Sequence, residues 1–205
     1  MFSQPGKTLA NRYKKPDHFT KRAKLEGYAA RSVYKLEEIQ RRFRPFKKGM
    51  RVVDLGCYPG SWSRYILQKI GRQGVLVGVD FTAPELDQGV WLERSIYDVS
   101  GEELCAALGG KCHVLVSDMA PRTTGNRLGD HVEQIALASR AWSIAQEILE
   151  PGGAFVVKIF DGEDANSFCL EVKKQCTQVK RLKPEATRRQ SREFFLIGMG
   201  FKPVQ

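Results

Sequence analysis

Short runs of β-branched and aliphatic residues alternate with longer amphipathic stretches from residue 51 almost to the C-terminus, and this alternation restricts the possible folds most. A repeated strand–helix order favours an α/β fold, with a mostly parallel sheet and helices on both faces. The longest amphipathic stretch, 130–149, ends at the breaker Glu150-Pro151-Gly152-Gly153. We therefore expect strands over 51–55, 75–80, 113–117, 154–160, 179–183 and 194–199, and helices over 31–42, 61–70, 101–108, 130–149 and 164–176.

Length and composition favour one folded domain. The chain has 205 residues, of which 42% are hydrophobic. No apolar run reaches the roughly 18 residues of a membrane-spanning helix, and the first residues lack the apolar segment of a secretion signal. We therefore expect a cytoplasmic protein that does not associate with membranes. The five cysteines form no Cys-x-x-Cys pair, so we interpret them as small buried hydrophobic residues and expect no metal site. They are Cys57, Cys105, Cys112, Cys169 and Cys176.

The net charge of +10 comes entirely from the first 50 residues, which hold 14 basic and 4 acidic side chains. Aromatic residues lie between these basic residues, as they do on surfaces that bind phosphates and unstacked bases. A solvated basic tail is the alternative interpretation. Because the excess charge is confined to one segment, we favour a nucleic-acid contact. We predict that residues 1–30 form a basic, RNA-contacting extension.

A glycine-containing loop follows the first expected strand and precedes a helix. It begins with Asp54, Leu55 and Gly56 and continues to Gly60. Glycines at this place let the backbone approach a ligand at the carboxyl ends of the strands. The loop lacks the third glycine of a dinucleotide fingerprint, and the acidic Asp54 disfavours a pyrophosphate. An acid here suits a ligand with a cationic group, such as the sulfonium and amino group of S-adenosylmethionine.

Two further acids stand at later positions along the same expected sheet edge. Asp80 ends the second strand, twenty residues after Gly60, where a carboxylate can accept both ribose hydroxyls of an adenosine. Asp98 follows in Ser95-Ile96-Tyr97-Asp98 and could accept the adenine amino group. Any one of these acids alone is more often a helix cap or turn former. Together with Asp54 they predict an adenosine-ligand site.

Four charged residues complete the candidate site: Lys35, Asp118, Lys158 and Glu193. Lys158 ends an apolar strand, where a lysine is uncommon because burial of its charge is costly unless the charge is paired or lost. A structural ion pair is the alternative for Lys158, and an ordinary exposed charge is the alternative for Lys35.

These segments closely resemble the FtsJ/RrmJ family of RNA ribose 2′-O-methyltransferases over residues 21–202. The resemblance rests on the loop Asp54-x-Gly-x-x-Pro-Gly60-x-Trp62 and on three later motifs. These are Ser117-Asp118-Met-Ala-Pro121, Pro151-Gly-Gly-x-Phe-Val-Val-Lys158 and Ser191-Arg-Glu193. The family's Lys-Asp-Lys-Glu tetrad maps onto Lys35, Asp118, Lys158 and Glu193. The glycine loop alone is shared by many methyltransferases, but the loop together with the ordered tetrad is highly specific.

The resemblance implies a Rossmann-like fold that binds S-adenosylmethionine, with cofactor contacts at Gly60, Trp62, Asp80, Asp98 and Asp118. It implies Lys158 as the general base that takes the proton of a ribose 2′-hydroxyl. It also implies a substrate, a uridine in the A-loop of 23S rRNA in the assembled large ribosomal subunit, and no obligate protein partner. Residues 31–205 would then be the methyltransferase domain. Cys57-Tyr58 stand where the family usually has two small residues.

Three rival functions remain open. A related methyltransferase that acts on transfer RNA would carry the same motifs. A nicotinamide-dependent oxidoreductase would explain the glycine loop and Asp80, but neither the basic N-terminal segment nor Lys158. A non-catalytic RNA-binding protein would explain the basic segment but not the ordered tetrad.

Overall fold

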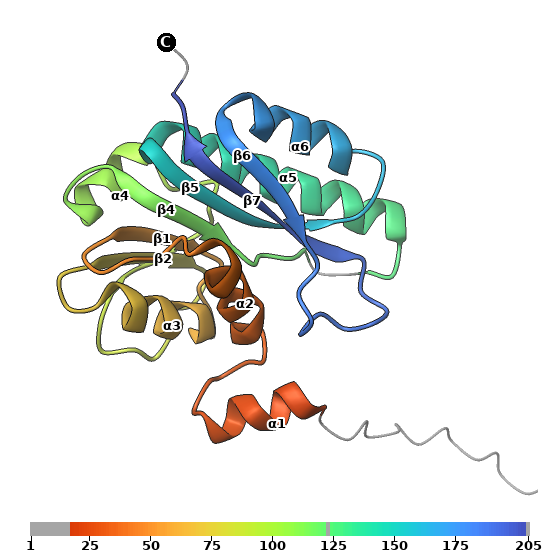
Figure 1. Ribbon diagram of the computed structural model, residues 1–205, viewed down its shortest axis with the longest axis horizontal. Helices are drawn as coiled ribbons and strands as arrows, with labels where there is room; N and C mark the ends of the chain where they lie inside the picture. The colour runs from red at the N-terminus through yellow and green to blue at the C-terminus, as the bar shows by residue number, and fades with distance from the viewer. Residues whose placement is uncertain (1–16, 122–123, 204–205) are drawn as a thin grey trace, which may run out of the picture.

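The computed structural model describes residues 17–121 and 124–203, which form a three-layer α/β arrangement (Figure 1). The strands are β1 (Arg51–Leu55), β2 (Val75–Asp80), β3 (Val90–Glu93), β4 (Cys112–Ser117), β5 (Leu149–Phe160), β6 (Cys176–Leu182) and β7 (Glu193–Phe201). The helices are α1 (His18–Leu25), α2 (Val33–Phe43), α3 (Ser61–Ile70), α4 (Gly101–Leu108), α5 (Arg127–Ile148) and α6 (Ala165–Lys174).

The strands form one sheet in the order β3-β2-β1-β4-β5-β7-β6. β7 pairs antiparallel with both β5 and β6, while the pairs among β3, β2, β1, β4 and β5 are parallel. The strand order reverses between β1 and β4, and such a switch point opens a crevice outside the carboxyl ends of the two strands. The predicted mostly parallel, Rossmann-like sheet is confirmed.

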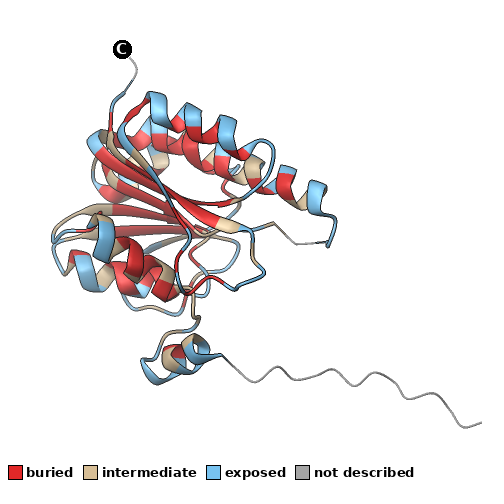
Figure 2. Cartoon of the chain, turned by 45° about the vertical axis from the view of Figure 1, so that its right-hand side comes forward, coloured by how far each residue is buried: buried red, intermediate tan, exposed pale blue. Residues whose placement is uncertain are grey.

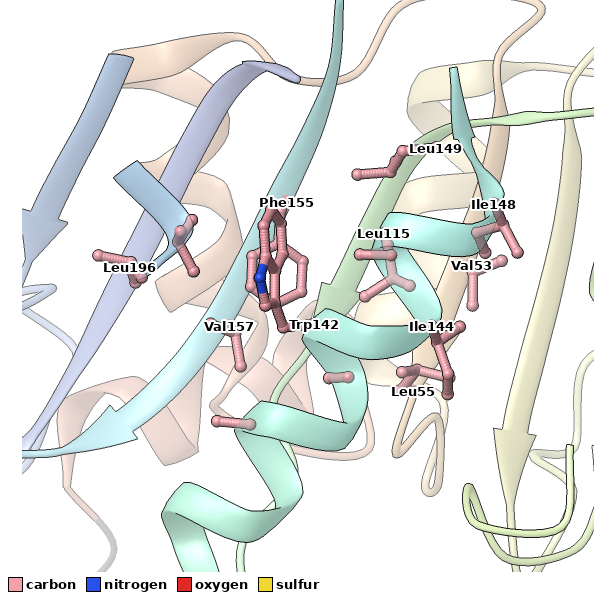
Figure 3. Packing of buried hydrophobic residues seen from close by; sticks show 14 of the residues in the cluster. Val53, Leu55, Leu115, Trp142, Ile144, Ile148, Leu149, Phe155, Val157 and Leu196 are labelled. Atoms are coloured by element: carbon pink, nitrogen blue, oxygen red, sulfur yellow. The ribbon is translucent and has the colours of Figure 1, made fainter. Parts of the chain in front are cut away.

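The two faces of the sheet carry two hydrophobic clusters. One cluster joins alternate strand residues to α4, α5 and α6, and within it Trp142 packs on Phe155 with ring centroids 5.0 Å apart (Figure 3). The other joins the opposite strand residues to α2 and α3. Both faces are therefore covered, and all the strands except β3 and β6 are buried along most of their length (Figure 2). Side chains point alternately to the two faces along a strand, so the position of a charged residue in its strand decides which face it occupies.

Most of the expected elements are present. The bounds of β1, β2, α3 and α4 agree with the prediction residue by residue. The breaker at 150–153 does end α5, but β5 begins already at Leu149, before the breaker. The reason is a register shift opposite Cys112 and Val114, where the residues between Leu149 and Ala154 loop out of the ladder.

Two elements were not expected. β3 is a strand of only four residues at the sheet edge, too short for a clear strand pattern, and none of its residues is fully buried. α1 has only Phe19 and Ala23 as an apolar stripe, which is too little to predict a helix. Asp17 caps α1, because its side chain accepts a hydrogen bond from the Thr20 N–H.

The N-terminal segment is described only from Asp17 onward, so Lys7, Arg12, Lys14 and Lys15 of the predicted basic extension lie outside the described residues. The remainder of that segment packs on the domain: Ala23 is buried in the α2–α3 cluster, and Phe19 lies 5.6 Å from the Tyr34 ring. The division of the chain at residue 30 stays a prediction.

The cysteines are free thiols. Cys57, Cys112, Cys169 and Cys176 are buried and Cys105 is half-buried, in agreement with their interpretation as small hydrophobic residues. Among the described residues, no helix combines the length and apolarity that crossing a membrane requires.

Candidate active site

The four candidate catalytic residues meet at the carboxyl edge of the parallel strands. Lys158 and Glu193 alternate with the residues of β5 and β7 that face α5, so both project toward the face covered by α2. Asp118 directly follows β4, and Lys35 is in the first turns of α2. Strand alternation and the position of α2 therefore bring the four side chains to one place.

Their contacts form a continuous chain of charges. The Lys158 ammonium lies 3.0 Å from Asp118 Oδ1 and donates a hydrogen bond of 2.6 Å to the main-chain oxygen of Asp118. The Lys35 ammonium lies 2.5 Å from Glu193 Oε1 and 3.9 Å from Asp118 Oδ1. Two cations and two carboxylates thus alternate, and the predicted cluster is present as a spatial unit.

The cluster is largely removed from water. Lys158 is only 6% exposed. Burial acts to raise the pKa of Glu193, but the charge and hydrogen bond of Lys35, together with the charge of Lys158, outweigh it and lower the pKa below its ordinary value. Glu193 therefore stays a carboxylate and fixes the Lys35 ammonium.

The orientation of β7 explains how Glu193 reaches this edge. Glu193 is the first residue of β7, and it pairs with Phe160, the last residue of β5. In a parallel strand the first residue would lie at the opposite edge of the sheet. Because β7 runs antiparallel, its start lies beside the end of β5.

A cavity of about 300 Å³ adjoins the charged cluster on the side of β1 and β2. Gly56, Asp80, Ile96 and Asp118 are among its lining residues, together with the apolar side chains of Val79, Met119 and Leu137. Asp118 thus lines the cavity and also holds both lysines. The cavity lies at the switch point of the sheet, where α/β folds bind ligands.

The donors and acceptors of the cavity suit an adenosine. Asp80 accepts backbone hydrogen bonds from Tyr58 at 2.9 Å and Phe81 at 2.7 Å, which fix its carboxylate at the rim of the cavity. An ionised carboxylate in this position can accept two ribose hydroxyls, and the apolar residues behind it suit a flat base. S-adenosylmethionine therefore fits the residues that are present.

Asp98 is placed less directly. Ser95, Ile96 and Tyr97 line the cavity, while Asp98 is exposed and follows them in the same turn, with its N–H bonded to the Ser95 oxygen. Its contact with an adenine amino group stays a prediction.

The glycine loop has two tight positions. Gly56 has φ of 82°, and a side chain there would meet Met119 Cγ at 2.4 Å, so only glycine lets the loop pass over the end of β4. Gly60 has φ of 94° and caps α3, where a side chain would meet Pro84. Gly56 lines the adenosine-sized cavity, whereas Gly60 lines a neighbouring cleft, which Tyr58 also lines.

Asp54 and Trp62 lie behind the site. Asp54 is 1% exposed and accepts a hydrogen bond of 2.6 Å from Ser63 Oγ. Burial raises the pKa of Asp54 to about 7, although the Ser63 hydroxyl acts in the opposite direction. The Trp62 indole donates to the Ser32 oxygen at 2.9 Å and packs on Phe195. Neither residue lines the cavity, so their ligand contacts stay predictions.

Sequence reasoning missed several supporting residues. Arg140 of α5 donates to the main-chain oxygens of Ile96 and Val99, at 3.0 and 2.7 Å, and so holds the turn that lines the cavity. Gln134 of α5 is buried, and its amide donates to the Lys158 oxygen at 2.8 Å. A polar residue on the core-facing side of a long amphipathic helix was the available signal for Gln134.

Comparison with known proteins agrees with this geometry. A family model described as "FtsJ-like methyltransferase" matches residues 28–201. The ribosomal RNA large subunit methyltransferase E of Sorangium cellulosum is 44% identical over 92% of this chain and 90% of its own length. The protein of the same name from Desulfosudis oleivorans is 42% identical, over 92% of each chain.

A solved structure, described as that of a ribosomal RNA methyltransferase from Plasmodium falciparum, has a similar fold. It superposes with a TM-score of 0.76 at 24% identity, and the match covers 86% of this chain and 100% of the other. At this identity the similarity supports the fold alone. The family match, which spans most of the described residues, and the two relatives show that this chain belongs to the FtsJ-like methyltransferase family.

Proposed function

We propose that this protein methylates a ribose 2′-oxygen in the RNA of the large ribosomal subunit, with S-adenosylmethionine as the methyl donor and Lys158 as the general base. The names of the similar bacterial proteins support ribosomal RNA as the substrate. The family resemblance of the tetrad motifs supports the 2′-oxygen of a uridine in the A-loop of 23S rRNA, modified in the cytoplasm. The observation that carries the proposal is that Asp118 lines the cofactor-sized cavity and also contacts Lys158.

In the proposed reaction Lys158 and its neighbours position the nucleophile and move one proton. The cofactor, when bound, supplies a methyl group that is electrophilic because it is attached to a sulfonium. Once its ammonium has released a proton to solvent, Lys158 accepts the proton of the 2′-hydroxyl through Nζ, which strengthens the oxygen as a nucleophile. Asp118 fixes Lys158 through two contacts, and Glu193 fixes Lys35.

A second cavity provides room for the ribose. It has a volume of about 400 Å³ and is lined by Lys35 and Glu193 together with Arg31, Arg188, Gln190 and Ser191. The charged cluster thus borders both this space and the cofactor cavity. An in-line transfer requires the 2′-oxygen to face the methyl group directly, so the ribose would reach in from this cavity until its 2′-hydroxyl meets the methyl donor, with Lys158 beside the hydroxyl.

The experiment is labelled-methyl transfer from S-adenosylmethionine to four substrates: isolated large subunits, isolated small subunits, protein-free 23S rRNA and transfer RNA. We expect 2′-O-methyluridine in digested 23S rRNA, with the large subunit as the best substrate. Label in transfer RNA alone would support the related transfer-RNA methyltransferase instead. Absence of transfer to every RNA would overturn the proposal.

A matched pair of variants ties the activity to the cluster. Lys158→Ala removes the proposed base, whereas Lys173→Ala removes an exposed lysine of α6. Only the first should abolish methyl transfer.

A further inference from the structure

A second groove continues from the Lys35–Glu193 cavity toward the N-terminal helix. It lies between α1 and the connection 183–192, which joins β6 to β7 and descends on the side of α1 and α2 (Figure 1). This α1 groove, of about 750 Å³, is lined on one side by residues 17–20, at the start of α1, and on the other by Glu185 and residues 187–190, with Arg31 between them. Arg31, Arg188 and Gln190 line both the groove and the Lys35–Glu193 cavity, so the two spaces are continuous.

Arg31 ties the two walls of the groove together. One nitrogen of its guanidinium bonds the Asp17 carboxylate at the start of α1, and another bonds the Ala186 oxygen in the opposite connection. The groove is therefore a built feature of the fold, in which α1 is held at a fixed distance from residues 183–192.

Three arginines line the groove, Arg31, Arg188 and Arg189, against two carboxylates, Asp17 and Glu185, and Asp17 is already paired with Arg31. No ion pair among the described residues includes Arg188 or Arg189, and both side chains are exposed. Burial lowers the pKa of Arg31, and the nearby charge of Arg188 lowers it further. Guanidinium groups that repel one another in this way are stabilised by an anion such as a phosphate.

The α1 wall offers flat rings. Phe19 is half-buried, with the Arg31 guanidinium 5.5 Å from its ring centroid, and the His18 ring stands edge-on at 5.6 Å. Aromatic rings beside guanidinium groups are a common platform for unpaired bases. On the other wall the Thr187 hydroxyl is buried and has no hydrogen-bond partner among the described residues.

We propose that the α1 groove binds the nucleotide next to the methylated one, in an unpaired RNA strand. The phosphate that links the two nucleotides would lie at Arg188, which lines both spaces, and the neighbouring base would stack on Phe19. This inference rests on the proposed function, since it assumes that a ribose occupies the Lys35–Glu193 cavity.

The burial of the cluster explains why the strand must be unpaired. The side chains of Lys35 and Glu193 are 12% and 13% exposed, and that of Lys158 is 7% exposed. A ribose can reach them only if its nucleotide enters the cavity, which a stacked and paired nucleotide cannot do. Its neighbour is then drawn away from the helix and needs a place of its own, which the adjoining groove provides.

The test measures binding of a fluorescent single-stranded ten-nucleotide RNA, and of the same RNA as a duplex, over a range of salt concentrations. Three variants are compared with the wild type: Arg188→Ala, Phe19→Leu and the control Arg72→Ala. Arg72 is also an exposed arginine, but it precedes β2, at the edge of the sheet opposite the site. Thermal unfolding confirms that each variant is folded.

We expect Arg188→Ala to weaken single-strand binding several-fold and to reduce the slope of log affinity against log salt by roughly 0.7, the loss of one phosphate contact. Phe19→Leu should weaken binding at least about fivefold with an unchanged slope, because it removes stacking and no charge. Arg72→Ala should match the wild type, and the duplex should bind more weakly than the single strand.

Two further RNAs locate the phosphate contact. One carries a neutral methylphosphonate at the linkage after the target nucleotide, and the other carries it at the linkage before that nucleotide. At one of the two positions it should reproduce the loss caused by Arg188→Ala and add nothing in that variant. Equal binding by Arg188→Ala and Arg72→Ala, or equal binding of duplex and single strand, overturns the assignment of the groove. These results are independent of methyl transfer by the wild type, whose absence would instead refute the proposed function.

Discussion

Replacement of Lys158 distinguishes a general base from a structural cation. Its ammonium contacts the Asp118 carboxylate at 3.0 Å and the Asp118 main-chain oxygen at 2.6 Å. Lys158→Ala removes the proton acceptor, so we expect single-turnover methyl transfer to fall about 10²–10⁴-fold, the usual contribution of a general base. Lys158→Arg should lose as much, because a guanidinium restores the charge but stays protonated and accepts no proton.

The stability cost of the alanine variant is limited by Lys35. Breaking a buried ion pair by removing one partner typically costs about 3–5 kcal/mol. Here Lys35 remains 3.9 Å from Asp118 Oδ1 and still balances its charge, so we expect a loss below that range. The variant should stay folded and should bind S-adenosylmethionine.

The assay mixes enzyme in excess with large ribosomal subunits and labelled S-adenosylmethionine, and follows label in the RNA over time. Cofactor binding by calorimetry and the unfolding temperature are measured beside it. If Lys158→Arg transfers methyl groups at a rate near that of the wild type, Lys158 is only a structural cation and the base assignment is refuted.

Three further outcomes follow from the geometry. Asp80→Asn should weaken S-adenosylmethionine binding by about 1–3 kcal/mol in calorimetry, because ribose hydroxyls lose a charged acceptor, whereas Asp87→Asn, at an exposed acid of the same connection, should not. Trp62→Phe should destabilise the fold by about 1 kcal/mol in denaturant unfolding and slow methyl transfer more than it weakens cofactor binding, because it frees Ser32 beside α2. Burial raises the pKa of Asp54 to about 7 in the folded state, above its unfolded value, so the folded state binds an extra proton between these two values. The free energy of unfolding should therefore fall by up to about 4 kcal/mol as pH rises from about 4 to 7. Asp54→Asn should flatten this dependence when denaturant unfolding is measured across pH.

The hydrophobic pattern of the sequence predicted strands and helices correctly where apolar residues are closely spaced. The short β-branched runs of β1 and β2 predicted strands, and the predicted bounds were correct. α1 was missed because its few apolar residues become buried only through tertiary contacts, such as Ala23 against the α2–α3 cluster, and β3 was missed because it is only four residues long. The looped-out residues of β5 could not be predicted from the sequence, because the register opposite Cys112 depends on the pairing with β4.

The acids and lysines of the candidate site could be predicted from the sequence, but the residues that hold its loops in place could not. Asp80 and Asp118 were recognisable because each stands at the end of an apolar strand. Arg140 was not, because an arginine on a long amphipathic helix is usually solvated, and its bonds to the Ile96 and Val99 oxygens depend on how α5 crosses the turn. Trp62 was assigned a cofactor contact, yet its indole hydrogen bond is to Ser32, a partner thirty positions away.

The meeting of Lys158 with Glu193 depends on strand direction, which residue patterns do not report. Both strands read as equally apolar, and a parallel β7 would have satisfied the same alternation of buried residues while placing Glu193 at the far edge of the sheet. Only the antiparallel pairing of Glu193 with Phe160 brings the carboxylate to Lys35. The cluster thus requires a reversed strand: the parallel strands present Asp118 and Lys158 at their carboxyl ends, and a strand of opposite direction supplies the second carboxylate from its first residue. Lys35 then joins the two carboxylates, which links the proposed cofactor cavity and the proposed ribose cavity in one network of charges.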